Sequence, residues 1–305
     1  MTLIARLTLL INEIGTDIKN MSSNSTIGTD KAIDLEGVTT EPNTPANNFL
    51  KLYAKKISGF MALKVKGASG LDFPLQTAFW QSNIIMWNPT NATAGLWLGT
   101  VGAGAGTYTT LLPTDINIYT SIKRGRWANV VTTLNQVLGQ RNLELLFFRG
   151  STVIGSGGFK FFARGGMDIW TNGARFFTGM HSATTVVSAK PSLLNNTVGF
   201  CVDDADNGLI YFLTRGTVAT KVSTGFYMAT NVGYDFYIFS APNGTSYTWR
   251  IVNLNTGAEA NGIATTNLPT VNTKLTAGFL ASNALLTPVN SVQIGLNRIY
   301  IEKDY

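Results

Sequence analysis

Apolar side chains in the first twenty-one residues recur at alternating spacings of three and four. They are Ile4, Leu7, Ile11, Ile14, Ile18 and Met21. This is the a/d spacing of a coiled coil, and isoleucine at both a and d positions favours three or four strands over two. The pattern predicts a trimerising helix over residues 1–22. An amphipathic helix packed on its own domain is the alternative, with an apolar face widened by Leu3 and Leu10.

The pattern changes after this helix. Residues 22–48 hold few aromatic side chains and contain Pro42 and Pro45, which is typical of an extended connector. Phe49–Lys55 then reads as a strand that precedes the turn signal Ser58-Gly59. We therefore expect an extended connector and neck over residues 23–70.

Beyond residue 70 the chain alternates short β-branched and aromatic runs with turn signals, which is typical of an antiparallel β-sandwich over residues 71–305. In residues 234–240 and 292–296 every second position is apolar, so each segment should bury one face. The strands expected are 159–163, 198–202, 209–214, 234–240, 247–254 and 292–301. Two segments, 127–140 and the neighbourhood of Leu193, have no clean helix or strand period.

Asn-Gly dipeptides are the strongest turn signals in this region, because tight hairpin turns need positive φ. There are four, at Asn172-Gly173, Asn207-Gly208, Asn243-Gly244 and Asn261-Gly262. Each predicts a hairpin. The fold class predicted is mainly β, with a short N-terminal coiled-coil helix followed by an antiparallel β-sandwich.

The composition indicates a folded chain that carries few charges. With 45% hydrophobic residues and a mean hydropathy of +0.12 the chain can bury a large core, yet only 13% of its residues are charged, against about 25% in an average soluble domain. The net charge of +6 comes from lysines and arginines spread along the chain, so no nucleic-acid partner is predicted. The densest basic stretch, Lys51–Lys66, reads as a solvated strand face or, alternatively, a phosphate site. No uncharged apolar run reaches about 18 residues, and membrane insertion is not expected.

Groups for catalysis are few. His181 is the only histidine and Cys201 the only cysteine, so we predict no metal site and no cofactor. Cys201 lies in an apolar run and should be an inert buried thiol. The carboxylate-rich segment Asp203–Gly208 resembles half of a calcium loop but lacks the completing glutamate. A hairpin turn stabilised by Asx side chains is the simpler interpretation.

Glycoside hydrolysis is the enzymatic alternative, because it needs only two facing carboxylates. A pair could come from Asp115, Asp168, Asp203, Asp204, Asp206 and Asp235. Recognition without catalysis fits the composition better, since tryptophan and tyrosine join a large apolar ring to a polar edge. The candidate glycan-binding residues lie beside turn signals and are Trp97, Trp170 and Asn172.

Four segments resemble bacteriophage tail-fibre and receptor-binding proteins. The first is the N-terminal helix, Ala5–Lys19, with its Ile-Gly-Thr-Asp-Ile-Lys ending. The second is the neck segment Glu41–Gly59, with its Pro-Asn-Thr-Pro and Leu-Tyr-Ala-Lys motifs. Ser69–Gln76 and Leu296–Tyr305 are also similar to this group. The resemblance is patchy, but it reaches both ends of the chain.

The resemblance implies a homotrimer in the virion, made in the host cytoplasm. Its N-terminal end would face other phage tail proteins, and a concanavalin A-like or jelly-roll sandwich would face the host surface. We therefore expect a non-enzymatic tail fibre that binds host surface glycan through many weak contacts multiplied by valency. The alternatives are a structural virion protein, such as a tail adaptor or capsid decoration, and a polysaccharide-degrading tail spike.

Overall fold

The structure is a computed structural model. It describes residues 25–27, 33–57, 60–68, 72–74, 83–89, 99–100, 106–129, 134–142, 144–153, 155–183, 189–284 and 291–303. The chain divides into two compact units, Met1–Ala78 and Phe79–Tyr305. The predicted helix over residues 1–22 lies outside the described residues.

The first unit contains paired strands. β1 (Ser25–Ile27) pairs with β2 (Ile33–Leu35), so residues 22–48 are not simply the extended connector that their composition predicts. A second sheet has the order β3 (Gly37–Val38), β4 (Leu50–Ile57), β5 (Phe60–Gly67) and β6 (Asp72–Pro74). β4 confirms the strand expected at residues 49–55. β6 pairs with β5, so this sheet continues past residue 70 within the first unit.

Lysines of the basic stretch lie on β4 and β5. The Nζ atoms of Lys55 and Lys64 lie 2.5 and 3.6 Å from Oε1 of Glu41. The Nζ of Lys51 donates to the backbone carbonyl of Asn43. The lysines therefore lie on strands, as one interpretation had it, but Lys64 is buried rather than solvated.

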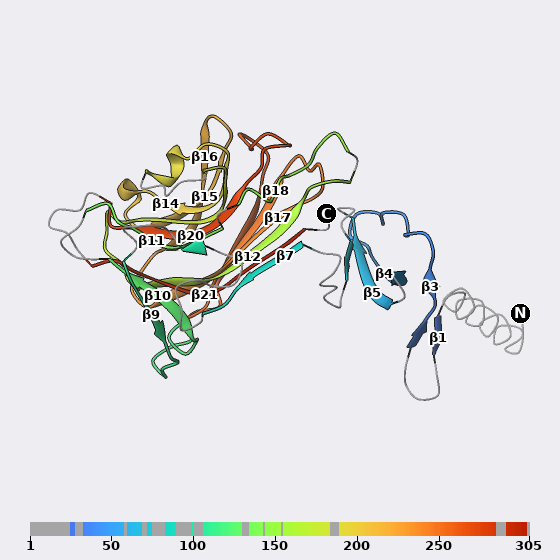
Figure 1. Cartoon of the computed structure of the whole chain (residues 1–305), viewed down its shortest axis with the longest axis horizontal. Helices are drawn as coiled ribbons and strands as arrows, with labels where there is room; N and C mark the ends of the chain where they lie inside the picture. Colours follow the sequence, from blue (N-terminus) through green and yellow to red (C-terminus); the bar gives the residue numbers. More distant parts are fainter. Residues whose placement is uncertain are drawn as a thin grey trace, which may run out of the picture. The chain divides into compact units, whose positions relative to one another are not determined.

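The second unit is an antiparallel sandwich of two sheets (Figure 1). The eight-stranded sheet has the order β19 (Glu259–Ala264), β18 (Tyr247–Asn253), β17 (Val232–Ser240), β12 (Phe159–Ile169), β21 (Gln293–Lys303), β10 (Arg124–Ala128) and β9 (Thr107–Leu111), and β7 (Asn83–Trp87) also pairs with β21. The seven-stranded sheet has the order β16 (Ala219–Tyr227), β15 (Leu209–Arg215), β14 (Thr197–Val202), β13 (Arg175–His181), β20 (Thr276–Ser282), β11 (Val137–Arg141) and β8 (Gly99–Thr100).

The core lies between these two sheets and is rich in aromatic rings. Phe176 packs edge to face against Phe279, and Phe212 stacks on Trp249 with ring centroids 5.3 Å apart. Each strand contributes alternate residues, because successive side chains point to opposite faces of a sheet. All six strands expected from the sequence are confirmed. The alternating pattern of residues 234–240 becomes β17, whose even-numbered side chains are buried in the core.

Three of the four Asn-Gly dipeptides occupy turns. Asn207 and Asn243 have φ of 51° and 54°, and each precedes the second strand of a paired hairpin. Asn172-Gly173 also turns, but it joins β12 of one sheet to β13 of the other. The prediction for Asn261-Gly262 is wrong, because both residues lie within β19. Glycine is needed there for packing, since a Cβ would lie 2.7 Å from Cζ2 of Trp249.

The two undecided segments have different outcomes. Residues 127–140 contain the end of β10 and most of β11, with residues 130–133 outside the described part. Leu193 ends a short 3-10 helix, η1 (Pro191–Leu193), and a second one, η2 (Asp204–Asp206), lies between β14 and β15.

No helix in the described part of the chain is long and apolar enough to cross a membrane.

Candidate functional site

Two of the three residues proposed for glycan contact lie in the loop between β12 and β13. The indole Nε1 of Trp170 donates to Oδ1 of Asn172 at 3.3 Å, and the Trp170 backbone N–H donates to Oγ1 of Thr230 at 3.0 Å. The ring is half-buried and packs against the core. Trp170 and Asn172 are therefore brought together, with Asn172 exposed. Trp97 lies outside the described residues, as do the proposed oligomerisation residues Ile4, Leu7, Ile11, Ile14, Ile18 and Met21.

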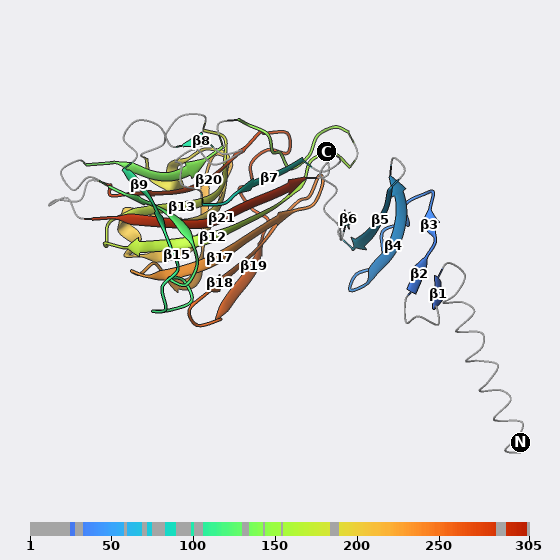
Figure 2. The same cartoon turned by 60° about the horizontal axis from the view of Figure 1, so that its bottom comes forward.

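A larger constellation lies on the face of the eight-stranded sheet that points away from the core. Strand register places one residue of each of five adjacent strands in a line across this face. We call these residues the aromatic row: Arg250 on β18, Tyr237 on β17, Phe162 on β12, Tyr300 on β21 and Met86 on β7. Each is the register partner of the next, and Figure 2 shows the five strands side by side.

The rings of the row are partly open to solvent. Phe162, Tyr237 and Tyr300 are half-buried, and Met86 is 39% exposed. The rings of Phe162 and Tyr237 lie with centroids 5.0 Å apart. Because neighbouring strands are about 4.8 Å apart, the three rings cover roughly 10 Å of the face. This is a length greater than a single sugar ring.

Ion pairs flank the rings. Arg164 donates from Nε and Nη2 to the two carboxylate oxygens of Asp235, at 2.6 and 2.7 Å. Arg250 donates from Nε and Nη2 to Oε2 of Glu259, at 3.0 and 2.5 Å. The guanidinium carbons of Arg164 and Arg250 lie 5.9 and 5.5 Å from the ring centroids of Phe162 and Tyr237. These distances are within the range of cation–π attraction.

These contacts shift protonation equilibria. The hydrogen bonds to Asp235 raise the pKa of Arg164. Burial, followed by the charge of Asp235, raises the pKa of Tyr237. Burial, together with its hydrogen bond to Glu302, raises the pKa of Tyr300, whose hydroxyl donates to Oε2 of Glu302 at 2.7 Å. Both phenols therefore stay neutral near pH 7, and the row offers apolar ring surface beside fixed donors and acceptors.

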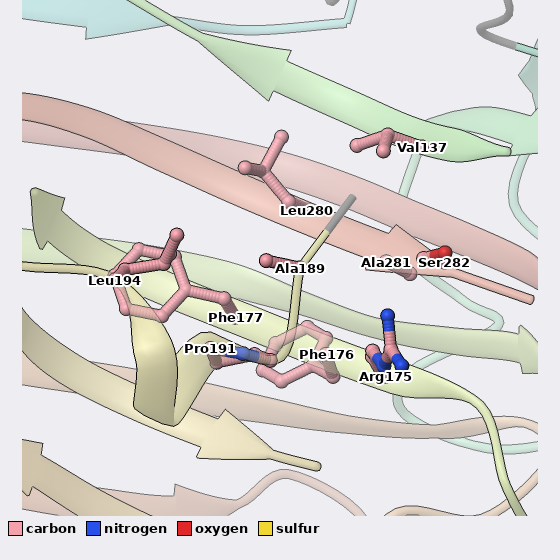
Figure 3. Close-up of a pocket in the computed structure, with 10 residues that line it drawn as sticks. All are labelled: Val137, Arg175, Phe176, Phe177, Ala189, Pro191, Leu194, Leu280, Ala281 and Ser282. Carbon is pink, nitrogen blue, oxygen red and sulfur yellow. The ribbon is translucent and has the colours of Figure 1, made fainter. Parts of the chain in front are cut away.

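The outward face of the seven-stranded sheet carries a pocket beneath η1 (Figure 3). Phe177 and Leu280 contribute apolar side chains, Pro191 and Leu194 lie against them, and Arg175 and Ser282 stand together at one end. The volume is about 20 Å³. This is room for about one water molecule, so the pocket does not admit a sugar ring.

His181 and Cys201 lie on this same outward face and are fully buried. Burial, with a smaller contribution from the charge of Arg141, lowers the pKa of His181 to about 4. Burial raises the pKa of the Cys201 thiol well above its usual value. The thiol is thus protonated and buried, and the prediction of an inert cysteine is confirmed.

The aspartates considered for catalysis or calcium are largely engaged by cations. Lys221 binds Asp203 at 3.1 Å and also contacts Asp206, while Asp204 lies 3.4 Å from Arg175 and 3.2 Å from Lys190. The segment forms the turn of the paired β14–β15 hairpin, with a capping box between Asp203 and Asp206. The hairpin interpretation is confirmed. Within the described residues, no group of three or more His, Cys, Asp or Glu side chains could hold a metal ion.

The sequence matches no protein-family model and no curated protein. Among solved structures, a Shewanella oneidensis MR-1 protein of unknown function has a TM-score of 0.51 at 11% identity, covering 72% of this chain and 86% of its own. Lectin I from Ulex europaeus, in complex with the methyl glycoside of α-L-fucose, has a TM-score of 0.48 at 10% identity, covering 73% and 98%. The family 7 polysaccharide lyase A1-II′, an alginate lyase, has a TM-score of 0.37 at 10% identity, covering 60% and 81%. The first similarity is one of fold alone.

The sequence analysis does not predict the aromatic row, although the sequence contains a pattern that indicates it. Phe162 lies between the core residues Phe161 and Ala163, and Tyr237 lies between Phe236 and Ile238. In each strand an aromatic side chain therefore occupies the position whose side chain points outward. That position normally holds a polar residue when one face is solvated.

Proposed function

We propose that the second unit is a non-enzymatic glycan-binding sandwich that uses the aromatic row as its contact surface. The apolar C–H faces of sugars pack on aromatic rings, and sugar hydroxyls hydrogen-bond to amide, carboxylate and guanidinium groups. The row combines both kinds of group on an open sheet face. An open face of this kind suits a chain of sugars better than a single small molecule in a pocket.

The observation that carries this proposal is the alignment of Tyr237, Phe162 and Tyr300 on adjacent strands. Solvation of a half-buried ring is unfavourable, because removing apolar surface from water contributes about 25 cal/mol per Å². Three such rings in one line leave a favourable contact unused until a ligand covers them. Two ion pairs fix the polar groups beside the rings, which lowers the entropy cost of binding.

We base the proposed oligomer and its place in a virion on the sequence alone. The heptad stem and the resemblance to tail-fibre proteins support a homotrimer in a phage virion, with the stem toward other tail proteins. Three copies of the row would then meet the host surface together. Multivalency of this kind raises avidity without any new contact, and it suits weak sites on an open sheet.

A structural virion protein is the second candidate, and one loop favours it. In the loop between β9 and β10 the side chains of Leu112, Ile116 and Ile118 are 70%, 73% and 56% exposed. Backbone hydrogen bonds such as that from Thr114 N–H to the Thr120 carbonyl, 2.9 Å, order this loop. Exposed aliphatic side chains on an ordered loop favour contact with another protein.

A polysaccharide-degrading spike gains less support. Five of the six aspartates considered for a catalytic pair contact arginine or lysine: Asp168, Asp203, Asp204, Asp206 and Asp235. A retaining or inverting glycosidase needs one protonated and one ionised carboxyl group on either side of the bond to be cleaved. The five carboxylates are instead engaged in ion pairs with cations of the same chain.

The test is binding of the full-length protein to a panel of immobilised bacterial surface polysaccharides. Tyr237→Ala should weaken binding about tenfold or more, equal to about 1.4 kcal/mol, while the far-ultraviolet circular dichroism stays unchanged. Tyr227→Ala is the matched control, because Tyr227 is a 57% exposed tyrosine on β16 of the other sheet. Equal binding by wild type and Tyr237→Ala would refute the row as the site, and binding by no member of the panel would favour the structural role.

A further inference from the structure

We infer that the aromatic row selects uncharged, hydroxyl-rich glycans and disfavours acidic ones. This inference rests on the proposed glycan-binding function and adds the class of sugar. It runs against the net charge of the chain, since a formal charge of +6 would by itself attract acidic polysaccharides. The reason is that the arginines over the rings already form ion pairs with carboxylates of the same sheet.

The central arginine is neutralised from within the sheet. Arg164 grips Asp235 through two parallel hydrogen bonds of 2.6 and 2.7 Å. The arginine side chain is 37% exposed, whereas that of Asp235 is only 7% exposed. If an acidic sugar formed an ion pair with Arg164, Asp235 would remain buried without its cation. That loss costs free energy and opposes binding.

The charged groups at the borders of the row have both charged and neutral partners. Arg250 donates twice to Glu259, and the two side chains are 49% and 47% exposed. On the other side, Glu302 accepts a hydrogen bond from the hydroxyl of Tyr300 and is the register partner of Lys160. Arg298, beside Arg164 in the register, donates from Nε to Oδ1 of Asn88 at 3.2 Å. The two arginines that lie over the rings, Arg164 and Arg250, are therefore both paired with carboxylates.

Hydroxyl groups can use these paired charges without separating them. A guanidinium has five N–H donors and a carboxylate about four acceptor sites, so the two hydrogen bonds in each arginine pair leave donors and acceptors unused. A sugar hydroxyl can donate to Asp235 or Glu259 and accept from Arg164 or Arg250. A carboxylate or sulfate on the sugar can only accept, and it meets Asp235 and Glu259 as like charges.

The experiment probes the full-length protein on an array that carries neutral and acidic bacterial glycans, at about 20 and 500 mM NaCl. We expect the bound glycans to be neutral, with signals that change less than about twofold between the two salt concentrations, because salt screens only charged contacts. Binding confined to acidic glycans, weakened by salt and lost in Tyr237→Ala, would overturn the inference while leaving the proposed function intact. Binding to no glycan would remove both.

A charge variant tests the mechanism directly. Glu259→Gln frees Arg250 at an exposed site and should not disturb folding. It should raise binding to acidic glycans at least threefold at low salt, and the gain should disappear at 500 mM NaCl. Glu144→Gln is the control, because it changes the net charge equally at an exposed residue between β11 and β12. An equal gain in both variants would show that net charge, and not pairing at the row, decides the class of glycan.

Discussion

At the residue scale, a buried ion pair joins Arg124 of β10 to Asp168 of β12. Arg124 donates from Nε and Nη2 to Oδ1 of Asp168, at 2.8 and 2.5 Å, and each side chain is 6% exposed. The guanidinium carbon of Arg124 lies 4.8 Å from the ring centroid of Tyr119. Gly295 makes room, since a Cβ there would lie 2.2 Å from the Tyr119 hydroxyl. This contact anchors the loop between β9 and β10 on the sheet.

Arg124→Ala should therefore lower the free energy of unfolding by about 3 to 5 kcal/mol, because it leaves a buried carboxylate without its cation. Arg126→Ala, on the same strand, should change it by less than about 0.5 kcal/mol. Arg126 is half-buried, and its Nη2 donates to Oγ1 of Thr109. Urea denaturation of both variants measures the difference, and equal losses would contradict a structural role for the pair.

His181 gives a pH dependence with a definite sign. Its pKa is about 4 in the folded chain, against about 6.5 when unfolded. The unfolded state therefore binds the extra proton between these values, and stability falls as pH drops from about 6.5 to 4. The full loss is about 3 kcal/mol at 1.36 kcal/mol per unit. His181→Gln should flatten the fall of the urea midpoint across this window, and an identical fall in both proteins would contradict it.

At the element scale, edge strand β19 depends on a glycine. Gly262 lies beneath the indole of Trp249 on the neighbouring strand β18. Gly262→Ala should destabilise the sandwich by about 1 to 3 kcal/mol, because the new methyl group must displace a packed ring. Asn261→Ala, one residue away and exposed, should change stability by less than about 0.5 kcal/mol. Thermal unfolding of the two variants measures the difference, and equal losses of stability would contradict a packing role for Gly262.

The same strand illustrates what the sequence could predict. Segments 234–240 and 292–296 were recognised because alternation within one strand reports one buried face. Asn261-Gly262 was misread because a dipeptide signal is local, whereas the packing of Trp249 over Gly262 depends on the partner strand. The row was missed for a similar reason. Phe162, Tyr237 and Tyr300 are far apart in the chain and become neighbours only through the register of three strands.

At the scale of the whole molecule, the core and the row both lie within residues 79–305. We expect this fragment to unfold cooperatively and to have the mass of one chain by multi-angle light scattering. The full-length protein should have the mass of three, because the heptad stem predicts a trimer. Ile11→Asn combined with Ile14→Asn should dissociate the full-length protein. A monomeric full-length protein, or a trimeric fragment, would contradict the stem as the oligomerisation element.

In the proposed function, glycan binds across the strands of the eight-stranded sheet. A crystal structure of the full-length protein with the strongest-binding glycan of the panel tests it most directly. We expect sugar rings stacked over Phe162 and Tyr237, with hydroxyls within hydrogen-bond distance of Arg164 and Asp235. Glycan bound instead beside Trp170 and Asn172, or in the pocket beneath η1, with the row left uncovered, would contradict it.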